Sequence, residues 1–352
     1  MTVKLSINDI ELEEQIGEGN FCIVNAAKLK TTSQTVAVKT YSKAQVDRMK
    51  KRGDVFMEKH ALRKLTHPNI ITLIDTFTDD LNAYVVMELC AAELWQLSKR
   101  WGEPERRAKF CLRDVMSALA FMHAAGVAHR DVKAENVFIT FSGRAKLGDL
   151  GSSRDFSDPS LPFSITPSFK KNFEHYVGTV QMMSPEAMDN TMNDQISDLW
   201  SFGALIYQNI LGLPPFHAAS EYFVMLRVKA GDLLFPDDLS ACGISPAAVD
   251  CVTKFCVLDR EKRMSLDTAM THAFFADVAN SLPGYTSAET LLKEEAQKRP
   301  MPQDAAQALA DAPTGAGEDG EIICNRIKWV RSWEWRCQMG AGSASVDHLN
   351  ID

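Results

Sequence analysis

The sequence has few of the features that mark secreted, zinc-stabilised or membrane-embedded proteins. Its 8 cysteines are scattered without a C-x-x-C pair, which disfavours a disulfide framework or zinc site and predicts free thiols in a reducing compartment. The first ten residues, MTVKLSINDI, lack the apolar core of a secretory signal. The longest apolar stretch, Leu199 to Phe216, contains Gln208 and Asn209, so it predicts a buried helix rather than a membrane span. We therefore expect a cytoplasmic protein.

The sequence also lacks an excess of basic charge. Lys and Arg number 38 against 46 Asp and Glu, which gives a formal net charge of −8. Broad nucleic-acid binding requires a basic footprint, so we expect no nucleic-acid partner. The composition is that of an ordinary globular protein, 45% hydrophobic and 24% charged over 352 residues. This length favours two domains, or one large domain with an appendage.

Hydrophobic periodicity divides the chain into three parts. The first part is rich in β-structure with one helix at 43–65, and its strands are expected at 10–16, 21–29, 35–40, 69–77 and 83–89. The second part is mainly helical, with helices expected at 105–125, 198–211, 223–230, 246–256 and 265–271. After residue 277 the sequence is rich in Ala, Gly, Pro and acidic residues, which predicts a helix at 287–298 and then a flexible linker.

Two features of the first part suit phosphate binding. Gly17 and Gly19 lie between two predicted strands, where glycine lets backbone amides approach a phosphate closely. Lys39 ends the β-branched run V-A-V-K, so its ammonium can extend from a strand toward phosphate oxygens. Each feature alone also fits an ordinary hairpin turn or a solvated lysine.

The most specific motif is H-R-D-V-K-A-E-N at residues 129–136. Asp131 can accept a proton from a substrate hydroxyl, and Lys133 can neutralise a phosphate in transfer. Asn136 and Asp149 offer two hard oxygen ligands, which suit Mg²⁺. Farther along, the motif S-P-E ends at Glu186, which could pair with Arg263.

In this order and at these spacings, the motifs resemble those of eukaryotic-type protein kinases. The resemblance covers about residues 10–276 and implies an α+β fold with two lobes. The small lobe, 10–89, would be rich in β-structure with one main helix, and the large lobe, 90–276, mainly helical. Residues 1–9 and 277–352 would be terminal extensions. The implied activity is transfer of the ATP γ-phosphoryl group, with Mg²⁺, to Ser or Thr of protein substrates.

The resemblance also implies roles for individual residues. Asp131 would be the catalytic base, assisted by Lys133, and Lys39 would pair with Glu58 of the small-lobe helix. Asn136 and Asp149 would hold Mg²⁺. The hinge would be Glu88 to Cys90, with Met87 as gatekeeper. The implied nucleotide-binding residues are Gly17, Glu18, Gly19, Asn20, Val24, Ala37, Lys39, Met87, Glu88, Cys90, Glu93, Asn136, Phe138 and Asp149.

Two segments narrow the resemblance to the AGC group. YVGTVQMMSPEAM and SDLWSFGALIYQNILGLPPFHAASEY are similar to the 3-phosphoinositide-dependent protein kinases, which phosphorylate activation loops of other AGC kinases. Calcium/calmodulin-type and polo-type kinases share parts of these two sequence segments and remain alternatives to the AGC group. The similarity implies a small-lobe pocket that docks a substrate's hydrophobic motif and is formed by Lys43, Val46, Val55, Lys59, Thr76 and Thr78.

Several positions depart from the pattern of the family. Cys22 replaces the third glycine of the nucleotide loop, and Leu150 replaces the usual Phe of D-F-G, where it keeps an apolar plug. His175 falls where these kinases carry an activating serine. We therefore expect activity without a phosphate at that position, with Glu174 pairing with Arg130 instead.

The C-terminal extension departs from the pattern as well. The segment after residue 276 is shorter than the roughly 100 residues of a pleckstrin-homology domain, so we expect no complete one. Trp329, Trp333 and Trp335 alternate with basic residues and fit either packing on the kinase lobes or a membrane or partner contact. A pseudokinase scaffold and a lipid-recruited adaptor are the other candidate functions. The retained catalytic set favours an active kinase.

Overall fold

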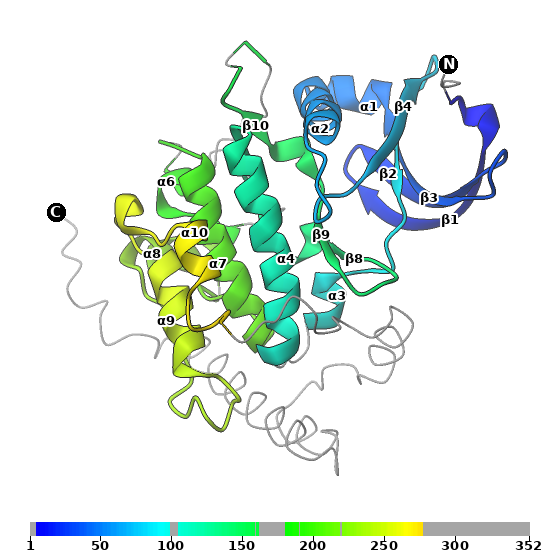
Figure 1. Cartoon of the computed structure of the whole chain (residues 1–352). Helices are drawn as coiled ribbons and strands as arrows, with labels where there is room; N and C mark the ends of the chain where they lie inside the picture. Colours follow the sequence, from blue (N-terminus) through cyan, green and yellow to red (C-terminus); the bar gives the residue numbers. More distant parts are fainter. Residues whose placement is uncertain are drawn as a thin grey trace.

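The computed structural model describes residues 5–98, 105–158, 160–161, 180–189, 191–218 and 220–276 of the chain. After a short 3-10 helix, η1 (Ile7–Asp9), five antiparallel strands form one sheet in the order β1-β2-β3-β5-β4 (Figure 1). Their bounds are β1 (Ile10–Gly19), β2 (Cys22–Leu29), β3 (Thr35–Ser42), β4 (Leu73–Thr78) and β5 (Asn82–Glu88). All five predicted strands are present, with bounds shifted by a few residues.

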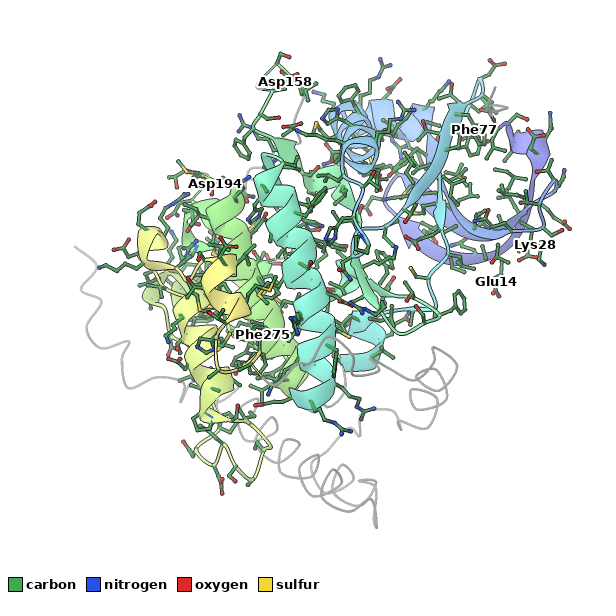
Figure 2. All side chains as sticks on the ribbon, viewed as in Figure 1. Glu14, Lys28, Phe77, Asp158, Asp194 and Phe275 are labelled. Atoms are coloured by element: carbon green, nitrogen blue, oxygen red, sulfur yellow. The ribbon has the colours of Figure 1, made fainter. Side chains whose placement is uncertain are left out.

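Strand β3 shows how the sheet separates two faces. Val36 and Val38 are buried on one face in a small cluster with Phe77, which is labelled in Figure 2. Side chains alternate along a strand, so Lys39 and Tyr41 point to the opposite face. Tyr41 there belongs to the main hydrophobic core, which continues into the large lobe. The same alternation therefore directs Lys39 toward the space between the lobes.

The single helix predicted over residues 43–65 is in fact two helices, α1 (Lys43–Arg48) and α2 (Arg52–Lys64). The break falls at Lys50, whose φ of +57° is left-handed and cannot continue a right-handed helix. Apolar residues of both helices pack on the same core, so the hydrophobic pattern runs through the break. The sequence prediction was wrong at this point for that reason.

The large lobe is mainly helical and lies beside the sheet (Figure 1). Its helices are α3 (Leu94–Ser98), α4 (Glu105–Ala124), α6 (Pro185–Met188), α7 (Gln195–Leu211), α8 (Glu221–Ala230), α9 (Pro246–Phe255) and α10 (Leu266–Met270). Its short strands are β6 (Ala92–Glu93), β7 (Val127–Ala128), β8 (Val137–Ile139), β9 (Ala145–Leu147) and β10 (Arg154–Asp155). Its 3-10 helices are η2 (Ala134–Asn136), η3 (Leu150–Ser152) and η5 (Arg260–Lys262). None of the helices described is long and apolar enough to cross a membrane.

Helix α7 is buried along most of its length and organises the large lobe. Asp194, labelled in Figure 2, caps it by accepting hydrogen bonds from two backbone N–H groups of its first turn. Gly212, with φ of +78°, ends it. A Cβ at Gly203 would lie 2.5 Å from Cβ of Phe255, so only glycine permits this close approach of α7 and α9. The helix predicted over 198–211 thus begins one turn earlier, at the Asp194 cap.

A buried ion pair joins α6 to the segment after η5. Nη1 and Nη2 of Arg263 donate to Oε1 and Oε2 of Glu186 at 2.6 and 2.8 Å. The Arg263 side chain is 0% exposed, and its guanidinium lies 5.1 Å from the ring centroid of Trp200. The pairing expected from the sequence is therefore confirmed.

Replacing Glu186 by alanine should destabilise the fold, because it leaves a buried guanidinium without its counter-charge. We expect the free energy of unfolding, measured by urea denaturation at pH 7, to fall by about 3–5 kcal/mol. Burial alone would raise the pKa of Glu186, but Arg263 outweighs this effect and lowers the pKa to about 2. The stabilisation should be complete above the unfolded pKa near 4.5 and be lost as the pH falls through about 2.

The matched control removes an acid from an exposed pair. Glu13 pairs with Lys28 on the outer surface of the sheet, and such pairs contribute little. Glu13→Ala should leave the urea midpoint nearly unchanged. An equal shift in the two variants would contradict the structural role given to the Glu186 pair.

Candidate active site

A cleft of about 300 Å³ opens between the small-lobe sheet and the large lobe. It is lined by the hairpin between β1 and β2, by β3 and α2, by the loop after β7, and by η3. The predicted site residues that line it are Gly19, Asn20, Lys39, Glu58, Asp131, Lys133 and Asp149. The structure thus brings together residues that lie far apart in the sequence.

Lys39 is the charged centre of the cleft. Its Nζ donates to Oε1 of Glu58 at 2.9 Å and to Oδ1 of Asp149 at 2.8 Å. Burial lowers the pKa of Lys39, but the charges of Asp149 and Glu58 outweigh this effect and keep the pKa above its ordinary value. The charge of Lys39 in turn lowers the pKa of Asp149. One ammonium group is therefore held between two carboxylates, the kind of cation that binds phosphate oxygens.

Asp131 and Lys133 face the same cleft from the large lobe. Nζ of Lys133 lies 2.7 Å from Oδ2 of Asp131. Burial lowers the pKa of Lys133, but Asp131 outweighs this effect and the pKa is raised. Nδ2 of Asn136 donates to the carbonyl oxygen and to Oδ2 of Asp131 at 2.7 and 3.0 Å. Because the amide nitrogen is committed to Asp131, the amide oxygen is the Asn136 atom that can bind a metal ion.

Asp198 on α7 supports the backbone of this loop. Its carboxylate is 1% exposed and accepts hydrogen bonds from the backbone N–H groups of His129 at 2.8 Å and Arg130 at 2.7 Å. His123 adds a contact at 2.9 Å through Nε2. Arg130 has a left-handed φ of +69°, which these bonds stabilise. Sequence reasoning missed this role, although Asp198 stands in the quoted motif S-D-L-W-S-F-G.

A second support joins the two large-lobe parts of the site. Nε2 of His129 lies 3.0 Å from the carbonyl oxygen of Gly148, and the N–H of Gly148 donates to the carbonyl oxygen of Asn136 at 2.9 Å. Gly148 directly precedes Asp149, so these bonds fix the position of Asp149 relative to Asn136.

Comparison with known proteins agrees with this geometry. Residues 10–275 match the family described as "Protein kinase domain". The chain belongs to the protein kinase family. The two-lobed α+β fold implied by the sequence is therefore confirmed, and a protein kinase domain acts with ATP.

Curated relatives of the kinase include "Serine/threonine-protein kinase PKH1" of Saccharomyces cerevisiae, which is 31% identical over 78% of this chain and 36% of that protein. "3-phosphoinositide-dependent protein kinase 1" of Arabidopsis thaliana is 32% identical over 66% of this chain and 48% of that protein. "Putative 3-phosphoinositide-dependent protein kinase 2" of Homo sapiens is 30% identical over 77% of this chain and 67% of that protein. These relatives confirm the similarity to the 3-phosphoinositide-dependent protein kinases. The chain spans 29% to 48% of the length of the first relatives it matches.

The other predicted nucleotide-binding residues of the kinase do not line the cleft described above. Several are cross-strand neighbours, namely Gly17 with Val24, Ala37 with Met87, and Glu93 with Phe138. Glu18 pairs with Ile23 in the hairpin of β1 and β2. Oε1 of Glu88 accepts from Nζ of Lys146 at 2.6 Å, and burial raises the pKa of Cys90 to about 12. Their roles in nucleotide binding stay predictions.

Two departures from the family pattern can be placed in the structure. Leu150 is 0% exposed and η3 packs on α2, so the expected apolar plug is confirmed. Cys22 lines the cleft, and burial raises the pKa of its thiol, which lowers the reactive thiolate fraction. The six described cysteines are buried or half-buried. The predictions for Glu174, His175 and the three tail tryptophans lie outside the described residues.

Proposed function

We propose that this kinase transfers the γ-phosphoryl group of ATP to Ser and Thr in the activation loops of other AGC kinases. The observation that carries the proposal is the placement of Lys39, Glu58 and Asp149 opposite Asp131 and Lys133 in one cleft. A scaffold has no need to keep a phosphate-binding cation, a base and two metal ligands together. The printed names of the relatives support Ser/Thr specificity and the choice of subfamily.

The donor atoms fit Mg²⁺ and a triphosphate. Asp149 offers a carboxylate whose pKa is lowered by Lys39. Asn136, whose backbone carbonyl oxygen accepts from the N–H of Gly148, would offer its amide oxygen as the second hard ligand. When bound there, Mg²⁺ would neutralise charge on the phosphates. Lys39 would hold phosphate oxygens, and the backbone of the hairpin at Gly19 would cover them.

The remaining residues act on the protein substrate. Asp131 would orient the Ser or Thr hydroxyl and accept its proton, and the Asn136 amide holds the Asp131 carboxylate for this task. Lys133 carries a positive charge beside Asp131 and would neutralise the phosphoryl group as it moves.

We also propose that α1, α2 and β4 form the substrate docking pocket. Val46 and Val55 are buried in the main core, and Val55 also lines the active-site cleft on the other side, so recognition of a peptide would fall to the rim. Thr76 accepts a hydrogen bond from Arg63, and Nζ of Lys43 donates to the carbonyl oxygen of Asp79. Lys59 on α2 and Thr78 on β4 would complete the rim with a cation and a hydroxyl. This chemistry suits an aromatic motif followed by a phosphate.

A phosphorylated F-x-x-F peptide should raise the rate at which the kinase phosphorylates short activation-loop peptides several-fold. Lys59→Glu should weaken binding of this peptide by about 10-fold or more, because it places a like charge beside the phosphate. Calorimetry measures binding, and peptide phosphorylation measures the rate. Lys262→Glu, at an exposed position of the large lobe, is the matched control and should change neither. An active enzyme that binds no such peptide would refute the pocket.

A further inference from the structure

Tyr41 contacts the Lys39–Glu58 pair directly. It lies two residues after Lys39 on β3, on the same face of the strand, and is 2% exposed. Its hydroxyl donates a hydrogen bond to Oε2 of Glu58, while Oε1 of Glu58 accepts from Lys39. We infer that Tyr41 is a positioning residue for phosphoryl transfer, which holds the Glu58 carboxylate in the orientation that pairs with Lys39. The inference rests on the proposed function.

The Glu58 carboxylate needs this second donor because of its surroundings. Glu58 is 2% exposed, and a buried carboxylate oxygen without a donor is costly. Lys39 donates to Oε1 of Glu58 and to Asp149, so Oε2 of Glu58 depends on another donor. The Tyr41 hydroxyl is a neutral donor that satisfies the other oxygen, so both Glu58 oxygens are fixed when Lys39 turns toward a phosphate.

The Tyr41 ring extends the same connection to the nucleotide loop. The ring centroid lies 5.4 Å from Nζ of Lys39, a distance at which an aromatic ring attracts a cation. Phe21, at the tip of the hairpin between β1 and β2, stacks on Tyr41 with centroids 5.9 Å apart. The Tyr41 side chain therefore contacts the hairpin, Lys39 and Glu58, and it also lines the cleft.

Tyr41→Phe removes the hydroxyl and keeps the ring, so it tests the hydrogen bond alone. Tyr84 provides a matched control, because it is also buried and its hydroxyl donates to a carboxylate, Oδ2 of Asp79 at 2.7 Å. Its ring belongs to the cluster on the opposite face of the sheet. If the Tyr41 hydroxyl had a purely structural role, Tyr41→Phe and Tyr84→Phe would both lower the melting temperature, and both would leave kcat per folded molecule unchanged.

The decisive experiment is a double-mutant cycle with Tyr41→Phe and Glu58→Gln. Tyr41→Phe alone should lower kcat by about 10-fold, as expected for the loss of one hydrogen bond to a charged group, with the KM of the peptide substrate unchanged. In the Glu58→Gln background it should have little further effect, because Tyr41 acts through Glu58. Tyr84→Phe should keep the wild-type kcat. Additive effects in the cycle, or a wild-type kcat in Tyr41→Phe, would overturn the inference.

The four proteins of the cycle (the wild type, Tyr41→Phe, Glu58→Gln and the double variant) are also titrated with a fluorescent ATP analogue. Tyr41→Phe should weaken nucleotide binding in the wild-type background and not in the Glu58→Gln background. This readout needs no phosphoryl transfer, so an inactive wild-type chain would refute the proposed function while the titration still decides on Tyr41. Equal weakening in both backgrounds would show that Tyr41 does not act through Glu58.

Discussion

The Asp149→Ala variant is expected to lose phosphoryl transfer, with activity reduced by about 10³-fold or more. The change removes one of the two oxygen ligands offered to Mg²⁺. It also removes the second carboxylate that Lys39 contacts, at 2.8 Å. Both losses weaken the neutralisation of charge on the phosphates and the positioning of the phosphates, and catalysis of phosphoryl transfer depends almost entirely on these two contributions. The measurement is incorporation of labelled phosphate from ATP into an activation-loop peptide.

The control for this variant is Asp189→Ala. Asp189 forms an exposed pair with Lys229 on the large lobe, so its loss should leave the rate unchanged. Melting temperatures of both variants establish that they are folded. Substantial activity in folded Asp149→Ala would show that Asp149 is not a required metal ligand, and it would contradict the assignment of the cleft as the kinase active site.

The Asp131→Asn variant is expected to lower kcat by about 10²- to 10⁴-fold, the usual contribution of a general base. Asparagine has nearly the same shape but cannot accept the hydroxyl proton. The hydrogen bond from the Asn136 side-chain amide to the backbone carbonyl oxygen of residue 131 does not depend on the side chain of residue 131, so the loop should keep its conformation. The affinity for ATP should therefore be close to that of the wild type. Steady-state kinetics and titration with a fluorescent ATP analogue measure the two quantities.

Asp158→Asn serves as the matched control. Asp158 lies at the end of the described segment after β10, away from the cleft, and Figure 2 labels it. Its variant should show wild-type kcat and ATP affinity. A kcat for Asp131→Asn within a factor of about three of the wild type would exclude proton acceptance by Asp131 as a major part of catalysis.

The fold could be predicted from the sequence wherever local pattern and tertiary packing agree. The alternation in V-A-V-K predicts a strand with one buried face, and the apolar spacing of residues 105–125 predicts a helix with one buried face. Both faces are buried in the structure. The break at Lys50 could not be predicted, because its left-handed backbone interrupts the helix without interrupting the hydrophobic pattern. Boundaries set by caps, such as Asp194 on α7, were missed by one turn.

The candidate site could be predicted as far as the family motifs reach. The pairing of Lys39 with Glu58 follows from the resemblance and is present at 2.9 Å. The roles of Tyr41 and Asp198 do not follow from it. Tyr41 reads as an ordinary strand residue, and its partner is 17 positions away. Asp198 bonds backbone groups 68 and 69 positions away, a contact that only the packing of α7 creates.

The central claim is that this cleft catalyses Mg²⁺-dependent transfer of phosphate to Ser or Thr. The most direct measurement combines the full chain with labelled ATP and an activation-loop peptide of an AGC kinase, with Mg²⁺ or with a chelator, followed by phosphoamino-acid analysis. The account predicts label on phosphoserine or phosphothreonine, only with Mg²⁺, and none with Asp149→Ala. Nucleotide binding without any transfer to protein or peptide, by a wild-type chain with a cooperative melting transition, would contradict it.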